Sequence, residues 1–268
     1  MKKFIFVLSV LCIACHPSAH DNLDPSNPKE VVDDQRELSS PQTILMLGDS
    51  LASETRFAYK MVEYLTQAKD FCGQAVSYDN LVHFYARPSA SPRHFVDSSG
   101  TNKDWLCRQK TIYRNGTAAN TTGPILCQNT QGVSVFTKLL NKHEPTIVIV
   151  ELISNSIGFS EAFIKSKVKQ TLDQIPDGKL CYWIGPTAVS NKYLAKVRKA
   201  ERALEEALLE YERLSCPLIK SVDAMLAQTQ CEKFNVSDGL HHTNCGSELW
   251  AEYVFNNLCQ LLDGNGPL

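Results

Sequence analysis

Short apolar runs recur along the chain and are separated by longer amphipathic stretches. They lie at Thr43–Leu47, Leu81–Tyr85, Thr146–Leu152, Leu180–Ile184 and Leu218–Val222. A run of this length is too short for a typical helix, and without polar alternation it is typical of a strand buried on both faces. Thr146–Leu152 is continuous and rich in β-branched residues, which makes it the strongest predicted strand.

Helical patterns fill the stretches between these runs. The predicted helices are a stripe through Phe57, Met61 and Leu65, then Val133–Lys142, Ser160–Ile175, Asn191–Leu214 and a closing helix from Trp250 to Leu261. Strands that alternate with helices indicate a parallel sheet covered on both faces. We therefore predict one α/β domain with three α/β/α layers over residues 43–262, followed by a short C-terminal tail at 263–268.

One long polar segment, Asp97–Asn129, interrupts this alternation. It contains Gly100, Asn115-Gly116 and Gly123-Pro124 as structure breakers. Because it is long for a loop without secondary structure, we predict a functional or disulfide-tied excursion from the domain.

The first residues resemble an export signal. Lys2 and Lys3 precede an apolar run that is too short to span a bilayer. We predict a signal peptide at 1–14. The cysteine that follows Ile-Ala resembles the lipidated residue of a bacterial lipoprotein, so we expect a membrane anchor at Cys15; the alternative is an ordinary secretory signal. Both predict a periplasmic or cell-surface protein, with the Asp-, Asn-, Pro- and Ser-rich segment 15–42 as a flexible tether.

Eight cysteines follow Cys15. An even number in an exported chain favours disulfides over the alternative of buried free thiols. No C-x-x-C pair occurs after the signal, which argues against a zinc site, and we predict neither metal nor cofactor. Spacing alone allows the pairs Cys107–Cys127, Cys181–Cys216 and Cys231–Cys245.

The overall charge of the chain bears on its partners. The net charge of −2 and the pI near 6.4 are not those of a nucleic-acid-binding protein, and no Lys/Arg-rich run appears. We therefore exclude nucleic acid as a partner.

A candidate nucleophile follows the first predicted strand. Gly48-Asp49-Ser50 lies where the strand ends and a helix begins, which is where open α/β sheets place their chemistry. The simpler interpretation is that Ser50 only caps the following helix by accepting a backbone N–H.

A candidate base lies in the loop before the last helix. Asp238 precedes His241 by three residues, so its carboxylate can accept the Nδ1 proton of that ring and leave Nε2 to take a proton from Ser50. His242 is a rival base at the next position.

An acyl-transfer site also needs donors for an oxyanion. Asn155 follows the strongest predicted strand, so its side-chain amide is expected in the same crevice as Ser50. The loop after the second strand offers the backbone N–H of Ser89 or Ala90, and Ser50 offers its own.

Together these segments resemble the GDSL, or SGNH, hydrolase family. The resemblance covers residues 43–262 and depends on Gly48-Asp49-Ser50-Leu51, Asn155 and Asp238-Gly239-Leu240-His241, in the family's order and spacing. It implies a flavodoxin-like parallel sheet of about five strands in the order 2-1-3-4-5, and ester hydrolysis through an acyl-serine. It also implies that Ser50 is the nucleophile, that His241 is the base oriented by Asp238, and that Asn155, with N–H groups of Ser50 and of the loop at Ser89 and Ala90, binds the oxyanion.

The sequence departs from the family pattern in two places. The family's second motif corresponds here to the loop at Ser89 and Ala90, and in the family it centres on a glycine. Ser89 and Ala90 lack glycine's freedom to adopt a positive φ. In the third motif, Ile153 holds the glycine position and Ser156 follows Asn155, which changes the expected local turn.

These observations predict an exported serine esterase that removes short acyl groups, acetyl in particular, from cell-envelope carbohydrate. Within the same family, the alternative is a lysophospholipase or thioesterase that acts on a lipid ester. A different class of function is a non-catalytic envelope lipoprotein that keeps the fold.

Overall fold

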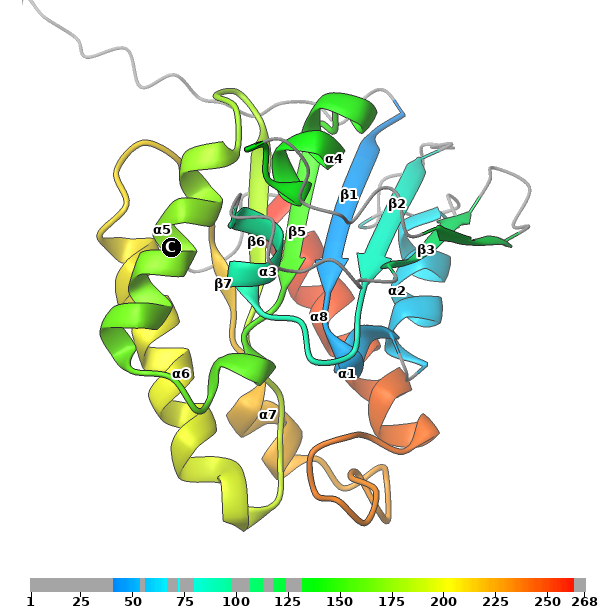
Figure 1. Ribbon diagram of the computed structural model, residues 1–268. Coiled ribbons are helices and arrows are strands. Elements are labelled where there is room, and N and C mark those ends of the chain that lie inside the picture. Colours follow the sequence, from blue (N-terminus) through cyan, green and yellow to red (C-terminus); the bar gives the residue numbers. More distant parts are fainter. Residues whose placement is uncertain are drawn as a thin grey trace, which may run out of the picture. The chain divides into compact units, whose positions relative to one another are not determined.

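A computed structural model describes residues 41–53, 56–66, 72, 80–97, 107–112, 118–123 and 132–262 (Figure 1). The predicted signal peptide at 1–14, the anchor at Cys15, almost all of the tether and the tail at 263–268 lie outside these residues. Among the described helices, none is long and apolar enough to cross a bilayer.

The described strands form one sheet. In chain order they are β1 (Thr43–Gly48), β2 (Leu81–Ala86), β3 (Cys107–Ile112), β4 (Ala118–Gly123), β5 (Ile147–Glu151), β6 (Leu180–Ile184) and β7 (Leu218–Ile219). The spatial order is β4-β3-β2-β1-β5-β6-β7. Five strands, β2-β1-β5-β6-β7, are parallel, and counted among themselves they follow the order 2-1-3-4-5. The predicted fold class is confirmed.

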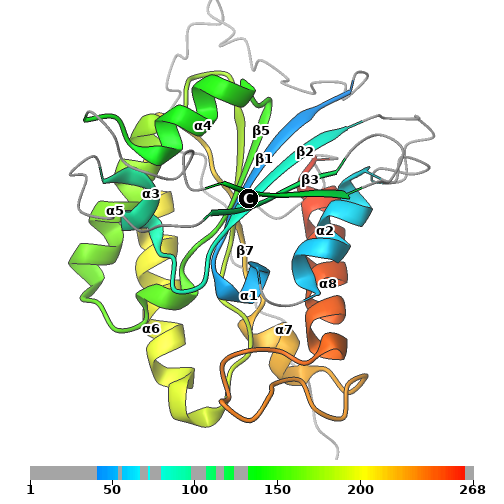
Figure 2. The ribbon, with the colours of Figure 1, turned by 45° about the vertical axis from the view of Figure 1, so that its right-hand side comes forward.

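Helices cover both faces of the sheet (Figures 1 and 2). On one face lie α2 (Phe57–Thr66) and α8 (Asn244–Leu262), and on the other α3 (Pro92–Val96), α4 (Val135–His143), α5 (Glu161–Gln174) and α6 (Asn191–Leu209). Along β1, Ile44 and Met46 pack toward the first face, while Leu45 and Leu47 pack toward the second. Both sets are buried, because successive strand side chains point to opposite faces, and this explains the continuous apolar run.

Short elements complete the carboxyl edge of the sheet, where the parallel strands end. They are α1 (Ser50–Ser53), the 3₁₀ helix η2 (Ser154–Ser156) and α7 (Val222–Ala227).

The last strand is shorter than the predicted Leu218–Val222, because it ends at Ile219 and α7 begins at Val222. Ser221 leaves the sheet because its hydroxyl donates to the Pro186 carbonyl and accepts from the Trp250 indole.

The long helix α6 is shorter than predicted, since it ends at Leu209 and not at Leu214. The residues beyond it bind the end of α5. The Arg213 guanidinium donates to the carbonyls of Leu172 and Ile175, and the Tyr211 hydroxyl donates to Asp173. The Arg213 bonds thus add a donor to carbonyls at the end of a helix, where intrahelical N–H partners run out.

The polar segment 97–129 contains β3 and β4, which the hydrophobic pattern did not predict. β3 is antiparallel to β2, and β4 is antiparallel to β3, so the pair extends the edge of the sheet. Sequences such as Cys107–Ile112 contain few apolar residues, and backbone pairing needs none.

Three disulfides join described cysteines. Cys181–Cys216 and Cys231–Cys245 confirm two of the pairs that spacing allowed, and the free-thiol alternative is wrong for them. Cys72–Cys259, which spacing did not indicate, joins the connection after α2 to α8. The third suggested pair, Cys107–Cys127, includes a residue outside the described part of the chain.

Candidate active site

Ser50 lies at the carboxyl edge of the sheet, at the first position of α1. A tight turn brings it there: a Cβ on Gly48 would lie 2.6 Å from the Cβ of Ala52, so only glycine fits. The capping interaction expected of Ser50 is made by its neighbour, because Asp49 Oδ1 accepts the N–H of Leu51 at 2.8 Å. The Ser50 hydroxyl is thus left for another partner.

That partner is His241. Its Nε2 lies 3.1 Å from Ser50 Oγ, and its Nδ1 lies 2.6 Å from Asp238 Oδ2. Because the carboxylate accepts a hydrogen bond from Nδ1–H, we assign the tautomer in which Nε2 is the acceptor for the serine proton. The structure therefore brings together the three residues that the sequence predicts as nucleophile, base and orienting acid.

Local hydrogen bonds hold Asp238 as an anion. Its Oδ1 accepts the backbone N–H groups of Leu240 and His241 at 2.8 and 2.9 Å. Desolvation on its own would raise the pKa of Asp238, but the bonds from the His241 ring and these two N–H groups outweigh it and lower the pKa to about 2.

The loop that carries Asp238 and His241 is fixed at its tip and at its base. At the tip, Gly239 has a φ of 73° and accepts the N–H of Ser190 at 2.9 Å. A Cβ on Gly239 would lie 2.4 Å from the Ser190 hydroxyl, so the close approach requires glycine.

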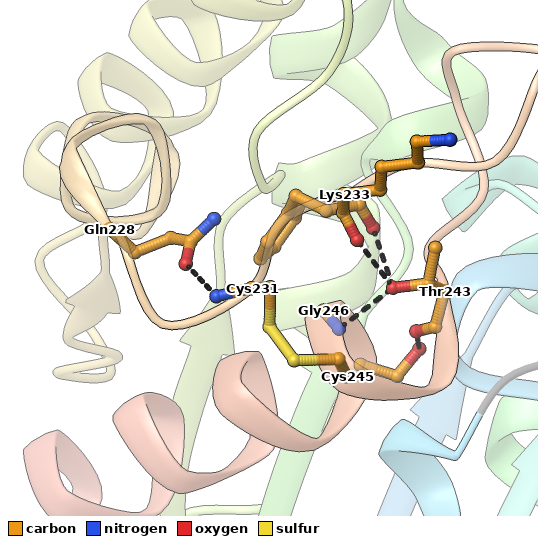
Figure 3. The surroundings of a disulfide bond; sticks show 8 residues. Gln228, Cys231, Lys233, Thr243, Cys245 and Gly246 are labelled. Atoms are coloured by element: carbon orange, nitrogen blue, oxygen red, sulfur yellow. Dashed lines mark hydrogen bonds between the residues drawn. A yellow bond between two sulfur atoms is a disulfide. The ribbon is translucent and has the colours of Figure 1, made fainter.

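At its base the same loop is closed by a disulfide (Figure 3). Cys231–Cys245 joins the start of the loop to α8. Beside it, the Thr243 hydroxyl donates to the Lys233 carbonyl at 2.8 Å and accepts the N–H of Gly246 at 3.1 Å. We call residues 231–245 the base loop.

His242 is not the base. Its ring is buried, tilted against Phe234 and edge-on to Trp250. Burial lowers its pKa to about 3, so the ring is neutral at physiological pH. Of the two adjacent histidines, only His241 reaches Ser50.

Asn155 lies in η2, just beyond the end of β5, and its amide is close enough to Asp49 to affect the pKa of that carboxyl. Its Nδ2 is buried and has no hydrogen-bond partner of good geometry among the described residues. The unusual Ile153 fits this turn, since its φ of −90° and ψ of −23° are right-handed and need no glycine. The amide therefore lies next to the residue that precedes Ser50, and its nearest described acceptor is the Asp49 carboxyl.

The second motif forms a turn with a positive φ despite the missing glycine. Ser89 has a φ of 63°, and Ala90 donates its N–H to the Arg87 carbonyl at 3.1 Å. With Pro88 before Ser89, this is a type II turn. Arg87 in turn donates its N–H to Gly48 at 3.1 Å, which holds the turn beside the Ser50 loop.

This turn distinguishes the two N–H groups that the sequence proposed as oxyanion donors. The Ala90 N–H is used inside the turn, so Ala90 is removed from the candidate donors. The Ser89 N–H makes no hydrogen bond among the described residues, as is usual for this position of a type II turn.

Two buried acids beneath Ser50 were missed by the sequence interpretation. Glu151 ends β5, Asp49 directly follows the end of the adjacent strand β1, and neither side chain is exposed. A charged residue inside the otherwise apolar run Thr146–Leu152 was the available signal. Among the described residues, no cluster of three or more His, Cys, Asp or Glu could hold a metal ion.

Comparison with known proteins finds similarity to solved structures only, and at low sequence identity this similarity shows the fold. No protein-family model and no curated protein matches the chain. Among solved structures, a putative SGNH hydrolase from Slackia heliotrinireducens matches with 14% identity and a TM-score of 0.53, covering 82% of this chain and 100% of that one. The lipase/acylhydrolase from Enterococcus faecalis matches with 14% identity and a TM-score of 0.52, covering 82% and 96%.

A third structure, an acetyl esterase mutant with acetate ion, shares 11% identity and a TM-score of 0.52 over 83% of this chain and 99% of its own. These similarities span nearly the whole length of each of the three proteins. The described chain therefore has the α/β/α fold of the SGNH hydrolases.

Proposed function

We propose that this protein is a serine esterase that hydrolyses short acyl esters through an acyl-serine intermediate. The observation that carries the proposal is the continuous chain of contacts from Asp238 through His241 to Ser50. Ser50 begins α1, whereas Asp238 and His241 lie in the base loop, far away in sequence, and their bonds have the order and atoms that nucleophilic catalysis needs.

In the proposed reaction, Ser50 Oγ attacks the ester carbonyl carbon while its proton passes to His241 Nε2. Asp238 stabilises the imidazolium that forms. The carbonyl oxygen becomes an oxyanion, which accepts hydrogen bonds from Asn155 Nδ2 and from the N–H groups of Ser50 and Ser89.

The tetrahedral intermediate then breaks its bond to the alcohol, which leaves with the proton held by His241. Water attacks the resulting acyl-serine with His241 again as base. The second collapse releases the carboxylic acid and restores the Ser50 hydroxyl.

We further propose that the protein is exported and anchored at Cys15, and that its substrate is an acetylated envelope carbohydrate. The disulfides support export, since such bonds persist in oxidising compartments. The side chains of Asp238 and His241 remain 46% and 33% exposed, which leaves room for a bulky alcohol component. The similarity to an acetyl esterase fold supports the short acyl group only by analogy.

The test is hydrolysis of p-nitrophenyl acetate, butyrate and longer esters by the oxidised protein. Ser50→Ala should abolish the activity, while Ser166→Ala, at an exposed serine of α5, should retain it. Equal background rates in wild type and Ser50→Ala would support a non-catalytic protein instead.

Chain length separates the substrate classes. Rates that fall from acetyl to longer acyl groups, together with acetate release from an O-acetylated polysaccharide, support the carbohydrate esterase. Rates that grow with chain length favour the lysophospholipase or thioesterase alternative.

A further inference from the structure

The buried acids Asp49 and Glu151 lie at the point where the two loops of the candidate oxyanion site meet. Glu151 ends β5 and is in register with Gly48, which ends β1. Beyond β1 the chain continues to Ser50, and beyond β5 it continues to Asn155. Any bond between these two strand ends therefore links two proposed oxyanion donors.

Glu151 makes such bonds in both directions. Its Oε2 accepts the backbone N–H of Asp49 at 3.1 Å, and its Oε1 is 3.5 Å from the Ser154 hydroxyl. Asp49 in turn fixes the start of α1, because its Oδ1 accepts the N–H of Leu51 in the first turn of that helix. The Glu151 carboxyl is thus placed between the Ser50 loop and the Asn155 loop.

The side chains of both acids are completely buried. Burial raises the pKa of Asp49 to about 7 and that of Glu151 well above its usual range, and the Asp49 charge raises the latter further. His241 is the other titratable group that acts on Asp49. Two carboxylates in such surroundings do not both ionise, so the pair retains a proton at neutral pH.

A proton on Glu151 also completes the hydrogen bonding. Asp49 Oδ2 is buried and has no hydrogen-bond donor of good geometry among the described residues, although the Asn155 amide lies close to this carboxyl. The two carboxyl groups are within hydrogen-bonding reach of each other, so a protonated Glu151 can donate to Asp49 while its other oxygen accepts. A buried polar group without a partner would otherwise be costly.

We propose that Glu151 is a positioning residue for the esterase reaction proposed above: as a neutral carboxylic acid it fixes the Ser50 loop against the Asn155 loop. In this role Glu151 keeps the distance between the N–H of Ser50 and the amide of Asn155 constant, so that both can donate to the same oxyanion. Glu151 itself does not touch the substrate.

The test compares Glu151→Gln with Glu151→Met in the full chain. Glutamine is neutral and can both accept from the Asp49 N–H and donate to its carboxyl, so Glu151→Gln should retain most of the wild-type kcat. Methionine has a similar length but makes neither bond, and Glu151→Met should lose about 100-fold in kcat with little change in KM, as expected for misplaced catalytic groups. Glu201→Met, at a partly buried acid of α6 with a raised pKa, is the control and should keep its activity.

A stability measurement tests the protonation state even if Glu151→Met does not fold. A carboxyl with a raised pKa contributes stability that is lost as pH rises above the unfolded-state value, and glutamine does not titrate. The urea midpoint of Glu151→Gln relative to wild type should therefore increase from pH 5 to pH 8. A constant difference, or a loss of more than tenfold in kcat for Glu151→Gln, overturns the inference.

These results are separable from the proposed function itself. If wild type shows no hydrolysis that depends on Ser50, the esterase proposal fails and the stability profile alone decides the state of Glu151. If wild type is active and Glu151→Met matches it, only the positioning role fails.

Discussion

The two sides of Ser50 are held by different kinds of structure. On one side, Asp238 and His241 lie in a loop whose side chains are partly open to solvent. On the other, Asn155 follows the strand that ends in Glu151, and the Ser89 turn is bonded through Arg87 to Gly48, next to Asp49; the side chains of both acids are fully buried. The base side depends on side-chain contacts within one short loop, whereas the oxyanion side depends on backbone conformation and on buried polar groups.

This difference determines how each side tolerates change. The base loop is short and is closed by its own disulfide and by Gly239. The oxyanion side departs from the family pattern at Ser89 and Ile153, and its backbone still adopts the turns that the site requires. Backbone geometry is thus preserved there by residues of a different type.

The largest expected effect is on the base side. His241→Ala should lower kcat by at least about 10⁴-fold, because no other described group reaches Ser50 Oγ as a base. Asp238→Asn should lose a comparable factor, since an amide favours the wrong tautomer of His241. Stopped assays with p-nitrophenyl acetate measure both, and a residual rate near wild type in either variant would contradict the assignment.

The next effect is on the oxyanion side. Asn155→Ala removes one proposed donor and should lower kcat by about 10²–10³-fold while KM changes little. Asn257→Ala, at an amide of α8 that donates to the Tyr253 carbonyl, is the matched control. If KM rises and kcat does not fall, Asn155 binds the substrate and is not an oxyanion donor.

Removing disulfides should separate stability from activity. The double variants Cys231→Ala/Cys245→Ala and Cys181→Ala/Cys216→Ala should each lose about 3 kcal/mol of unfolding free energy. Only the first should also lose about tenfold or more in kcat when folded, because it frees the base loop. Urea unfolding and kinetics on the same samples decide this, and equal kinetic losses would show that the base loop holds its geometry without the disulfide.

Adjacent histidines give a pH test. Burial lowers the pKa of His242 to about 3, whereas an unfolded histidine titrates near 6.5. The unfolded state therefore binds the extra proton between these values, and His242 lowers stability as pH falls below 6.5. Relative to wild type, His242→Phe should gain about 2 kcal/mol between pH 7 and pH 5, measured by urea unfolding. A difference that does not change with pH would mean that His242 is not held neutral by burial.

The smallest expected effect is at Ser89. Its φ of 63° is unfavourable for a residue with a side chain, so Ser89→Gly should stabilise the fold by about 0.5–1 kcal/mol after the entropy cost of glycine. Because the proposed donor is the backbone N–H, kcat should stay at the wild-type level. A lower kcat would assign a role to the hydroxyl.

The sequence predicted the parallel layers, because buried strands and amphipathic helices leave strong patterns such as Thr146–Leu152. It also predicted the contact among Asp238, His241 and Ser50, since the three-residue spacing and chain order constrain it. It did not predict β3 and β4, whose pairing depends on the backbone, nor the start of α7. The conformation of Ser89 and the pairing of Cys72 with Cys259 depend on tertiary contacts that no local pattern records.

The contact between Ser50 and His241 joins residues 191 positions apart in the chain. Contacts of such sequence separation form late and slowly, because a long segment must first be ordered. Ser50 is synthesised before the base loop, because His241 follows it by 191 residues. Under the proposed mechanism, the appearance of esterase activity during refolding therefore reports when Ser50 and the base loop meet. A chain that lacks the base loop has a nucleophile but no base.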